Sequence, residues 1–247
     1  MFKEVEMKKQ YPFYFLIIIL FLSFALLNHR AFCQDLKADK TLDEKVERFL
    51  ENKRWEWSDQ NVPYADGKVL YDIIVKNNYK RALEIGTSTG HSAIWIAWAL
   101  SKTGGKLITI EINEIRLKEA LANFEEAGLS DYIDARLSNA HTLVEELEGP
   151  FNFVFSDADK DWYTNYFKAI APKLTVGGCY VTHNVSAGRF GRRFGRGMGA
   201  WSGDFYGYVT SLSNFESTLD NSGAGMLISY KKADEQSNRT IVGRDQK

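Results

Sequence analysis

The chain has 247 residues, of which 45% are apolar and 26% are charged, a composition typical of a soluble globular protein. This composition excludes a disordered, collagen-like or polytopic membrane protein. Lys and Arg number 31 against 32 Asp and Glu, so the net charge of −1 provides no basic excess for binding nucleic acid, and none is expected as a partner. The two cysteines, Cys33 and Cys179, are too few for a disulfide framework or a cysteine-rich zinc site.

The N-terminal segment has the pattern of a targeting signal. Basic residues precede an apolar run at Phe13–Leu27, and the small residues Ala31 and Cys33 stand at positions −3 and −1 of a cleavage site. We therefore predict a secretory signal in residues 1–33 that is cleaved after Cys33, and an exported protein. The alternative is an uncleaved membrane anchor, because residues 11–27 fall within the tolerated length of a bilayer span.

The remaining residues, 34–247, are predicted to form a single domain in which strands and helices alternate. The expected strands are Arg81–Ile85, Lys106–Ile112, Tyr132–Leu137, Phe151–Phe155 and Cys179–Val185. The expected helices are Leu42–Leu50, Lys68–Val75, His91–Leu100, Glu114–Ala127, Ala140–Leu147 and Trp162–Leu174, the last stopped by Gly177 and Gly178. The tail Asn214–Lys231 is predicted to form an antiparallel hairpin at the sheet edge. This alternation favours an open, mostly parallel sheet with helices on both faces.

A glycine-rich turn follows the first expected strand. Gly86 and Gly90 let the backbone approach a ligand closely, at the strand ends where open α/β sheets bind nucleotides. Glu111 ends the second expected strand, where a carboxylate can accept hydrogen bonds from ribose hydroxyls. The spacing E-x-G-x-x-x-G lacks the third glycine of dinucleotide enzymes, so an adenosyl ligand without phosphates fits better. The alternative is a turn that only connects strand to helix.

An acidic cluster, DADKDWY at Asp157–Tyr163, stands where the fourth expected strand ends. With this cluster, the sequence resembles the cation-dependent O-methyltransferases, the group that contains the catechol and caffeoyl-coenzyme A O-methyltransferases. The other matching segments are LEIGTSTGHS at the turn, LITIEIN at the second strand and THNV at the fifth. The resemblance extends from about Asp59 to Lys231.

The resemblance implies a Rossmann-like methyltransferase fold with a seven-stranded, mostly parallel sheet and an antiparallel edge hairpin. It implies an S-adenosylmethionine-dependent O-methyltransferase acting on a hydroxyl of a catechol-like or other small aromatic substrate. The implied cofactor-binding residues are Val62, Glu84, Gly86, Ser88, Ser92, Glu111 and Asp157, with His141 near the adenine. Lys160 would be the general base that takes the proton from the substrate hydroxyl; the alternative is an ion pair at a helix start.

By the same resemblance, Asp157, His183 and Asn184 would hold a divalent metal ion. The family normally has Asp-Asn where this chain has His183-Asn184. A histidine in place of the aspartate removes a negative charge, which disfavours Mg²⁺ and favours a transition metal. The alternative is that His183 forms hydrogen bonds within a metal-free pocket, and both interpretations stay open here.

Several further hypotheses stay open. The loop Gly188–Trp201, with four Arg among five Gly, suits a lid over an anionic or aromatic substrate, or a solvated loop. Association with a membrane through residues 11–27, and a homodimer, are partner hypotheses. Two other functions compete with methyl transfer: an exported, non-catalytic domain of the same fold, and a nicotinamide-dependent oxidoreductase, which the glycine spacing disfavours.

Overall fold

The computed structural model describes residues 41–57, 61–186 and 200–234. The N-terminal signal and all but the end of the loop Gly188–Trp201 lie outside the described residues. The chain divides into two units, Met1–Lys45 and Val46–Lys247, and residues 41–45 of the first are helical. No helix in the described ranges is long and apolar enough to cross a membrane.

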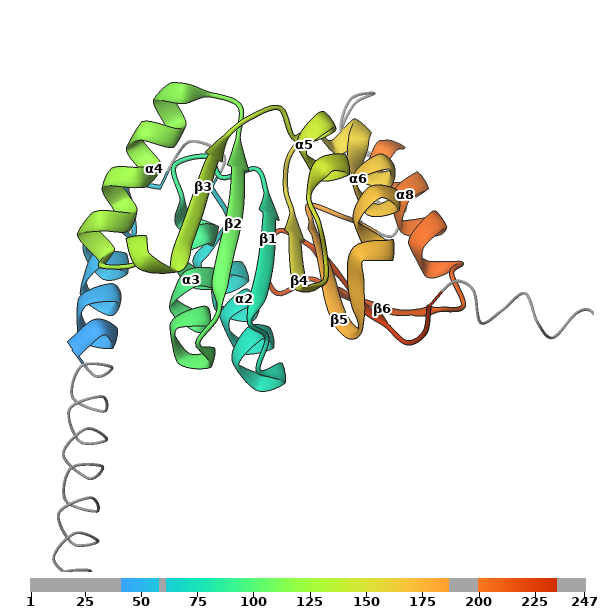
Figure 1. The fold of residues 1–247 in the computed structure, drawn as a ribbon, viewed down its shortest axis with the longest axis horizontal. Helices are drawn as coiled ribbons and strands as arrows, with labels where there is room; N and C mark the ends of the chain where they lie inside the picture. Colours follow the sequence, from blue (N-terminus) through green and yellow to red (C-terminus); the bar gives the residue numbers. More distant parts are fainter. Residues whose placement is uncertain (1–40, 58–60, 187–199, 235–247) are drawn as a thin grey trace, which may run out of the picture. The chain divides into compact units, whose positions relative to one another are not determined.

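Seven strands form one sheet in the order β3-β2-β1-β4-β5-β7-β6 (Figure 1). They are β1 (Arg81–Ile85), β2 (Lys106–Glu111), β3 (Ile133–Leu137), β4 (Phe151–Ser156), β5 (Leu174–His183), β6 (Phe215–Asp220) and β7 (Met226–Lys231). Strands β1 to β5 pair in parallel, whereas β7 pairs antiparallel with both β5 and β6. The predicted fold class, including the edge hairpin, is confirmed.

The helices cover both faces of the sheet (Figure 1). They are α2 (Tyr64–Asn77), α3 (His91–Thr103), α4 (Glu114–Ala127), α5 (Ala140–Glu146), α6 (Tyr163–Ile170) and α8 (Ala200–Thr210). Side chains alternate across a strand, so Leu83 and Ile85 join the buried cluster formed with α5, α6 and α8. Glu84, between them, points to the opposite face, where α3 packs. The carboxyl ends of β1, β2 and β4 therefore meet between the two helical layers.

Three elements, α6, β5 and α2, have an end four or five residues from the predicted position. The helix expected at Trp162–Leu174 is α6 flanked by short 3₁₀ turns, and β5 already begins at Leu174. Pro172, which lacks a backbone N–H, lies in the second turn. Gly177, with φ of +80°, lies inside β5, where the register with β4 shifts, so it does not stop a helix. Helix α2 begins at Tyr64 rather than at the expected position 68, which places Asp66 in its first turn.

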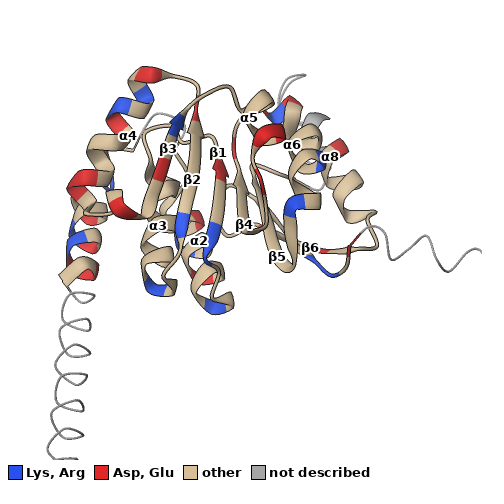
Figure 2. Cartoon of the chain, in the orientation of Figure 1, with Lys and Arg blue, Asp and Glu red and all other residues tan. Residues whose placement is uncertain are grey.

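Basic and acidic residues are interspersed over the described chain in the view of Figure 2, in keeping with the near-zero net charge.

Candidate functional site

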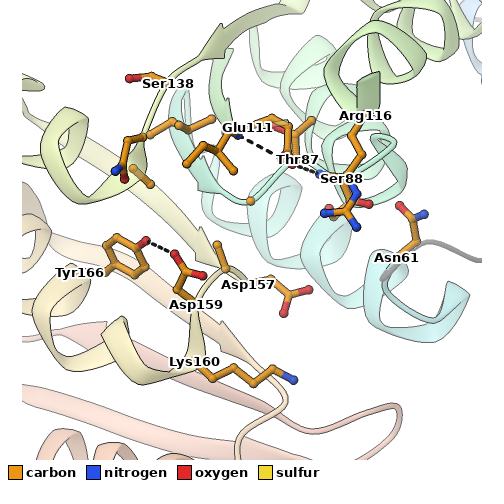
Figure 3. A pocket seen from close by; sticks show the side chains of 17 residues that line it. Asn61, Thr87, Ser88, Glu111, Arg116, Ser138, Asp157, Asp159, Lys160 and Tyr166 are labelled. Carbon is orange, nitrogen blue, oxygen red and sulfur yellow. Dashed lines mark hydrogen bonds between the residues drawn. The ribbon is translucent and has the colours of Figure 1, made fainter. Parts of the chain in front are cut away.

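A pocket lies at the carboxyl ends of β1, β2 and β4 (Figure 3). Glu111 and Arg116 lie on one side of it, and Asp157 and Lys160 lie on the other. The residues that line it are Asn61, Gly86, Thr87, Ser88, Ser92, Ile110, Glu111, Ile112, Arg116, Ser138, Asn139, Ala140, Asp157, Ala158, Asp159, Lys160 and Tyr166. The structure thus brings together six predicted site residues from three strand ends, namely Gly86, Ser88, Ser92, Glu111, Asp157 and Lys160.

The glycine turn forms one wall of the pocket. Gly86 has φ of +99°, and a Cβ there would lie 3.0 Å from the Ala158 side chain after β4. Gly90 has φ of +98°, and a Cβ there would lie 2.5 Å from the Phe124 ring on α4. Both positions therefore require glycine, one for the close approach of the turn to the neighbouring strand end and the other for helix packing.

Glu111 holds this turn in place. One carboxylate oxygen accepts a hydrogen bond from the backbone N–H of Ser88 at 2.8 Å. The other accepts from the N–H groups of Ile112 and Asn113 at 3.0 and 2.8 Å. Each carboxylate oxygen has two lone pairs, so acceptor capacity remains on the Ser88 side for a ligand.

Glu84 lies under the pocket rather than on its surface. It is fully buried, and the Thr109 hydroxyl donates a hydrogen bond of 2.5 Å to it. Burial raises the pKa of Glu84 to about 8, although hydrogen bonds from Ser92 and Thr109 oppose the shift. The group is therefore neutral at pH 7. Its position indicates a role in supporting the pocket floor.

Val62 and His141 also lie beside the pocket rather than in its lining. The buried Val62 carbonyl accepts a hydrogen bond of 2.8 Å from Nδ1 of His91. Burial lowers the pKa of His91 to about 4, so this imidazole is neutral. The His141 ring stacks on Trp162 with centroids 3.8 Å apart, and its Nε2 lies 3.0 Å from Asp159.

Three residues around the pocket adopt positive φ without being glycine. The φ values are +49° for Ser88, +40° for Asp159 and +54° for Asn184. Such conformations cost about 1–3 kcal/mol each and concentrate at functional sites. In the described residues, the only other such position is Asn78, which caps the end of α2.

The candidate base and metal ligands lie at one end of the pocket, between β4 and β5. Lys160 Nζ donates a hydrogen bond of 2.6 Å to Asn184 Oδ1. The buried His183 side chain contacts two carboxylates, with Nδ1 3.0 Å from Asp157 and Nε2 2.9 Å from Asp66. Burial alone would lower its pKa, but the hydrogen bonds and charges of Asp157 and Asp66 raise it to about 9. In the ranges that the structure describes, no group of three or more His, Cys, Asp or Glu is arranged to hold a metal ion.

Two residues of this site were not identified from the sequence. The predicted helix began at position 68, which left Asp66 outside it. In the structure α2 begins at Tyr64, so Asp66 lies in its first turn and contacts His183. Asn61 lines the pocket, and its side chain donates to Thr89 at 2.8 Å and accepts from the His91 N–H at 3.3 Å. Asn61 directly precedes Val62, an expected cofactor-binding residue, and this was the available signal for it, whereas Asp66 carried none.

The strand order and the pocket define a Rossmann-like α/β protein with a pocket at the topological switch point of its sheet, beside β1. Family comparison then identifies the group. Residues 35–188 match the O-methyltransferase family model, and the chain belongs to that family.

Relatives of the chain are named as O-methyltransferases. The chain is 39% identical over 123 residues to a catechol O-methyltransferase of Niastella koreensis, covering 48% of this chain and 55% of that protein. It is 34% identical over 127 residues to caffeoyl-CoA O-methyltransferase 1 of Eucalyptus globulus, covering 49% of this chain and 51% of that protein. The chain thus spans about half the length of these curated relatives.

Solved structures share the fold. An O-methyltransferase from Bacillus cereus in complex with SAH has a TM-score of 0.66 at 24% identity, covering 76% of this chain and 91% of that one. The O-methyltransferase TomG from Streptomyces achromogenes, in complex with SAM, has a TM-score of 0.65 at 25% identity, covering 77% and 90%.

Proposed function

We propose that this protein transfers a methyl group from S-adenosylmethionine to a hydroxyl of a small aromatic acceptor of the catechol type. The observation that carries the proposal is the pocket itself, in which the Glu111-braced glycine turn faces Asp157 and Lys160. The names of the curated relatives, and the cofactors bound in the solved neighbours, support it.

The cofactor half of the pocket suits an adenosyl ligand. Glu111 is buried and presents acceptor capacity beside Ser88, which fits it to accept hydrogen bonds from ribose hydroxyls. Gly86 leaves room for the backbone to approach the ligand without a side chain between them. S-adenosylmethionine carries no phosphate, so the turn does not have to supply a pyrophosphate cradle.

Lys160 is the residue we assign to proton transfer. As the neutral amine, it takes the proton of the acceptor hydroxyl, and the oxygen then attacks the methyl carbon of the sulfonium. The carbon–sulfur bond breaks with its electron pair on sulfur, which leaves the neutral thioether of S-adenosylhomocysteine. Asn184, at 2.6 Å from Nζ, orients the Lys160 amine toward the pocket.

The divalent ion implied by the family resemblance does not fit the side chains as they are arranged. His183 directs one ring nitrogen at Asp157 and the other at Asp66, and Asn184 Oδ1 accepts from Lys160. No step of the proposed reaction passes through a metal.

We propose further that the protein is exported, with residues 1–33 as its signal. The basic start, the apolar run and the small residues before position 34 support this localisation. The alternative is membrane association through residues 11–27, which requires that the same segment is not cleaved.

Two measurements on the purified full chain test the proposed reaction. In a calorimeter, S-adenosylmethionine and S-adenosylhomocysteine are expected to bind in the pocket, and NAD is expected not to bind. Incubation with catechol and S-adenosylmethionine is expected to yield a methylated catechol and S-adenosylhomocysteine in equal amounts by mass spectrometry. Binding of NAD without S-adenosylmethionine would favour an oxidoreductase, and cofactor binding without turnover on a panel of phenols would favour the non-catalytic domain.

A further inference from the structure

His183 joins three elements of the fold through its imidazole ring. It ends β5, and its side chain is 4% exposed. Nε2 lies 2.9 Å from Oδ2 of Asp66 in the first turn of α2, and Nδ1 lies 3.0 Å from Oδ2 of Asp157 just after β4. We call this arrangement of Asp66, His183 and Asp157 the carboxylate–imidazole bridge.

Both ring nitrogens of His183 are engaged by carboxylates. Nδ1 lies within hydrogen-bond distance of Asp157 and Nε2 within hydrogen-bond distance of Asp66. A ring nitrogen that donates a hydrogen bond to a carboxylate oxygen has no lone pair to offer a metal, because a metal binds the unprotonated nitrogen.

The far side of the bridge is closed by the edge hairpin. Asp66 is fully buried, and the backbone N–H of Ala224 donates to its Oδ2 at 3.0 Å. A Cβ built on Gly223 would lie only 1.7 Å from Asp66 Oδ1, so the turn between β6 and β7 packs directly on this carboxylate. The hairpin turn therefore covers this side of Asp66.

The third expected ligand also has a partner. Asn184 Oδ1 accepts a hydrogen bond of 2.6 Å from Lys160 Nζ. The side-chain atoms expected to ligate an ion are therefore already engaged by other side chains of this protein. A divalent ion here would have to displace the His183 ring and the Lys160 side chain from these contacts.

We propose that the carboxylate–imidazole bridge takes the place of the divalent ion of the related cation-dependent enzymes, so that this protein binds no divalent metal between Asp157 and Asn184. His183 is then a positioning residue that holds Asp157 and the start of α2 against the pocket. The proposal concerns ion binding and is tested without the methyl-transfer reaction, so its failure and that of the proposed function are separate outcomes.

Manganese(II) is the probe for the test, because the electron paramagnetic resonance signal of free Mn²⁺ falls when the ion binds. The full-length wild-type protein, titrated at neutral pH, is expected to leave the signal unchanged. The variant His183→Asp, which removes the imidazole ring and restores the family's carboxylate, is expected to bind one Mn²⁺ per chain. Its melting temperature is expected to rise by a few degrees with Mn²⁺, while that of the wild type stays constant.

The variant His183→Gln is the matched control, since it removes the ring without adding a negative charge. It is expected to bind Mn²⁺ at least tenfold more weakly than His183→Asp. Stoichiometric Mn²⁺ binding by the wild type, lost in His183→Gln, would overturn the proposal and make His183 a ligand. The wild-type titration decides this even if neither variant folds. A His183→Asp variant that folds but binds no Mn²⁺ would also overturn the assignment of the bridge as the replacement for the ion.

Discussion

At the scale of single residues, the pocket depends on carboxylates whose surroundings differ sharply. Glu111 accepts three backbone N–H groups, which satisfy the acceptor capacity of a carboxylate in a buried position. Glu84, one strand away and facing the interior, accepts a hydrogen bond of 2.5 Å from the Thr109 hydroxyl, and burial raises its pKa to about 8. Two glutamates at neighbouring strand ends thus have separate roles, one toward the ligand and one toward the fold.

Replacing Glu111 is expected to weaken cofactor binding. Glu111→Ala deletes the charge-assisted hydrogen bonds to ribose and releases the Ser88 N–H, at a cost of about 1–3 kcal/mol in binding free energy. Calorimetric titration with S-adenosylhomocysteine measures this. Glu111→Gln, which keeps one acceptor oxygen, is the control and is expected to lose less. An unchanged dissociation constant in Glu111→Ala would contradict the assignment.

Replacing Lys160 tests proton transfer separately from charge. Both Lys160→Ala and Lys160→Arg are expected to lower turnover by roughly 10²–10⁴, the usual contribution of a general base. Arg keeps the positive charge but does not deprotonate, so it cannot act as the base. Turnover is followed with catechol, and affinity for S-adenosylhomocysteine is expected to stay unchanged in both variants. If the Arg variant retained full activity, Lys160 would act through its charge.

Glu84 is expected to make stability depend on pH. Its folded-state pKa of about 8 lies above the ordinary value of 4.5, so the folded protein holds an extra proton between these values. The stabilising effect of the protonated group is complete below pH 4.5 and is lost as the pH rises to about 8, by at most about 1.4 kcal/mol per pH unit. In urea unfolding, the free energy of unfolding of Glu84→Gln is therefore expected to rise relative to that of the wild type as the pH is raised across this window. Parallel stability curves for the two proteins would show that Glu84 does not titrate there.

At the scale of elements, glycines set the packing of α3. Gly90 precedes α3 and lies against Phe124 of α4, whereas Gly104, which follows α3, has open space around a built Cβ. Both have positive φ, at +98° and +71°, so a side chain at either position adds a conformational cost. Only Gly90 adds a steric cost between two helices.

This contrast gives a matched pair of variants. Gly104→Ala is expected to lower the free energy of unfolding by about 1–2 kcal/mol, the cost of the left-handed conformation. Gly90→Ala adds overpacking against the Phe124 ring and is expected to cost about 1–3 kcal/mol more. Urea unfolding of both variants measures the difference, and equal losses would mean that α4 moves away without cost.

At the scale of the whole molecule, the proposed export depends on the N-terminal segment. If residues 1–33 are a cleaved signal, protein recovered from its native source is expected to begin at Gln34. Intact-mass analysis of the exported and membrane fractions tests this. Recovery of the segment Phe13–Leu27 on the native chain would support the membrane anchor instead.

The sequence by itself determined the fold class, because the alternation of apolar runs and helical stripes leaves few ways to bury both. It also identified Gly86, Glu111, Asp157 and Lys160, which share the pocket because carboxyl ends of parallel strands meet at one edge. The inferences for Gly86 and Glu111 rest on local patterns, and the roles of Asp157 and Lys160 rest on the family resemblance, so none of them needed the spatial neighbours of each residue.

Only the tertiary structure decided how His183 is used. Asp66 and His183 are 117 positions apart in the chain, and nothing in the spacing predicts their contact. The contact depends on the start of α2, on the end of β5 and on the hairpin turn that closes over Asp66. A side chain's protonation and its ability to ligate a metal depend on such distant partners, because burial and charge act through space rather than along the sequence.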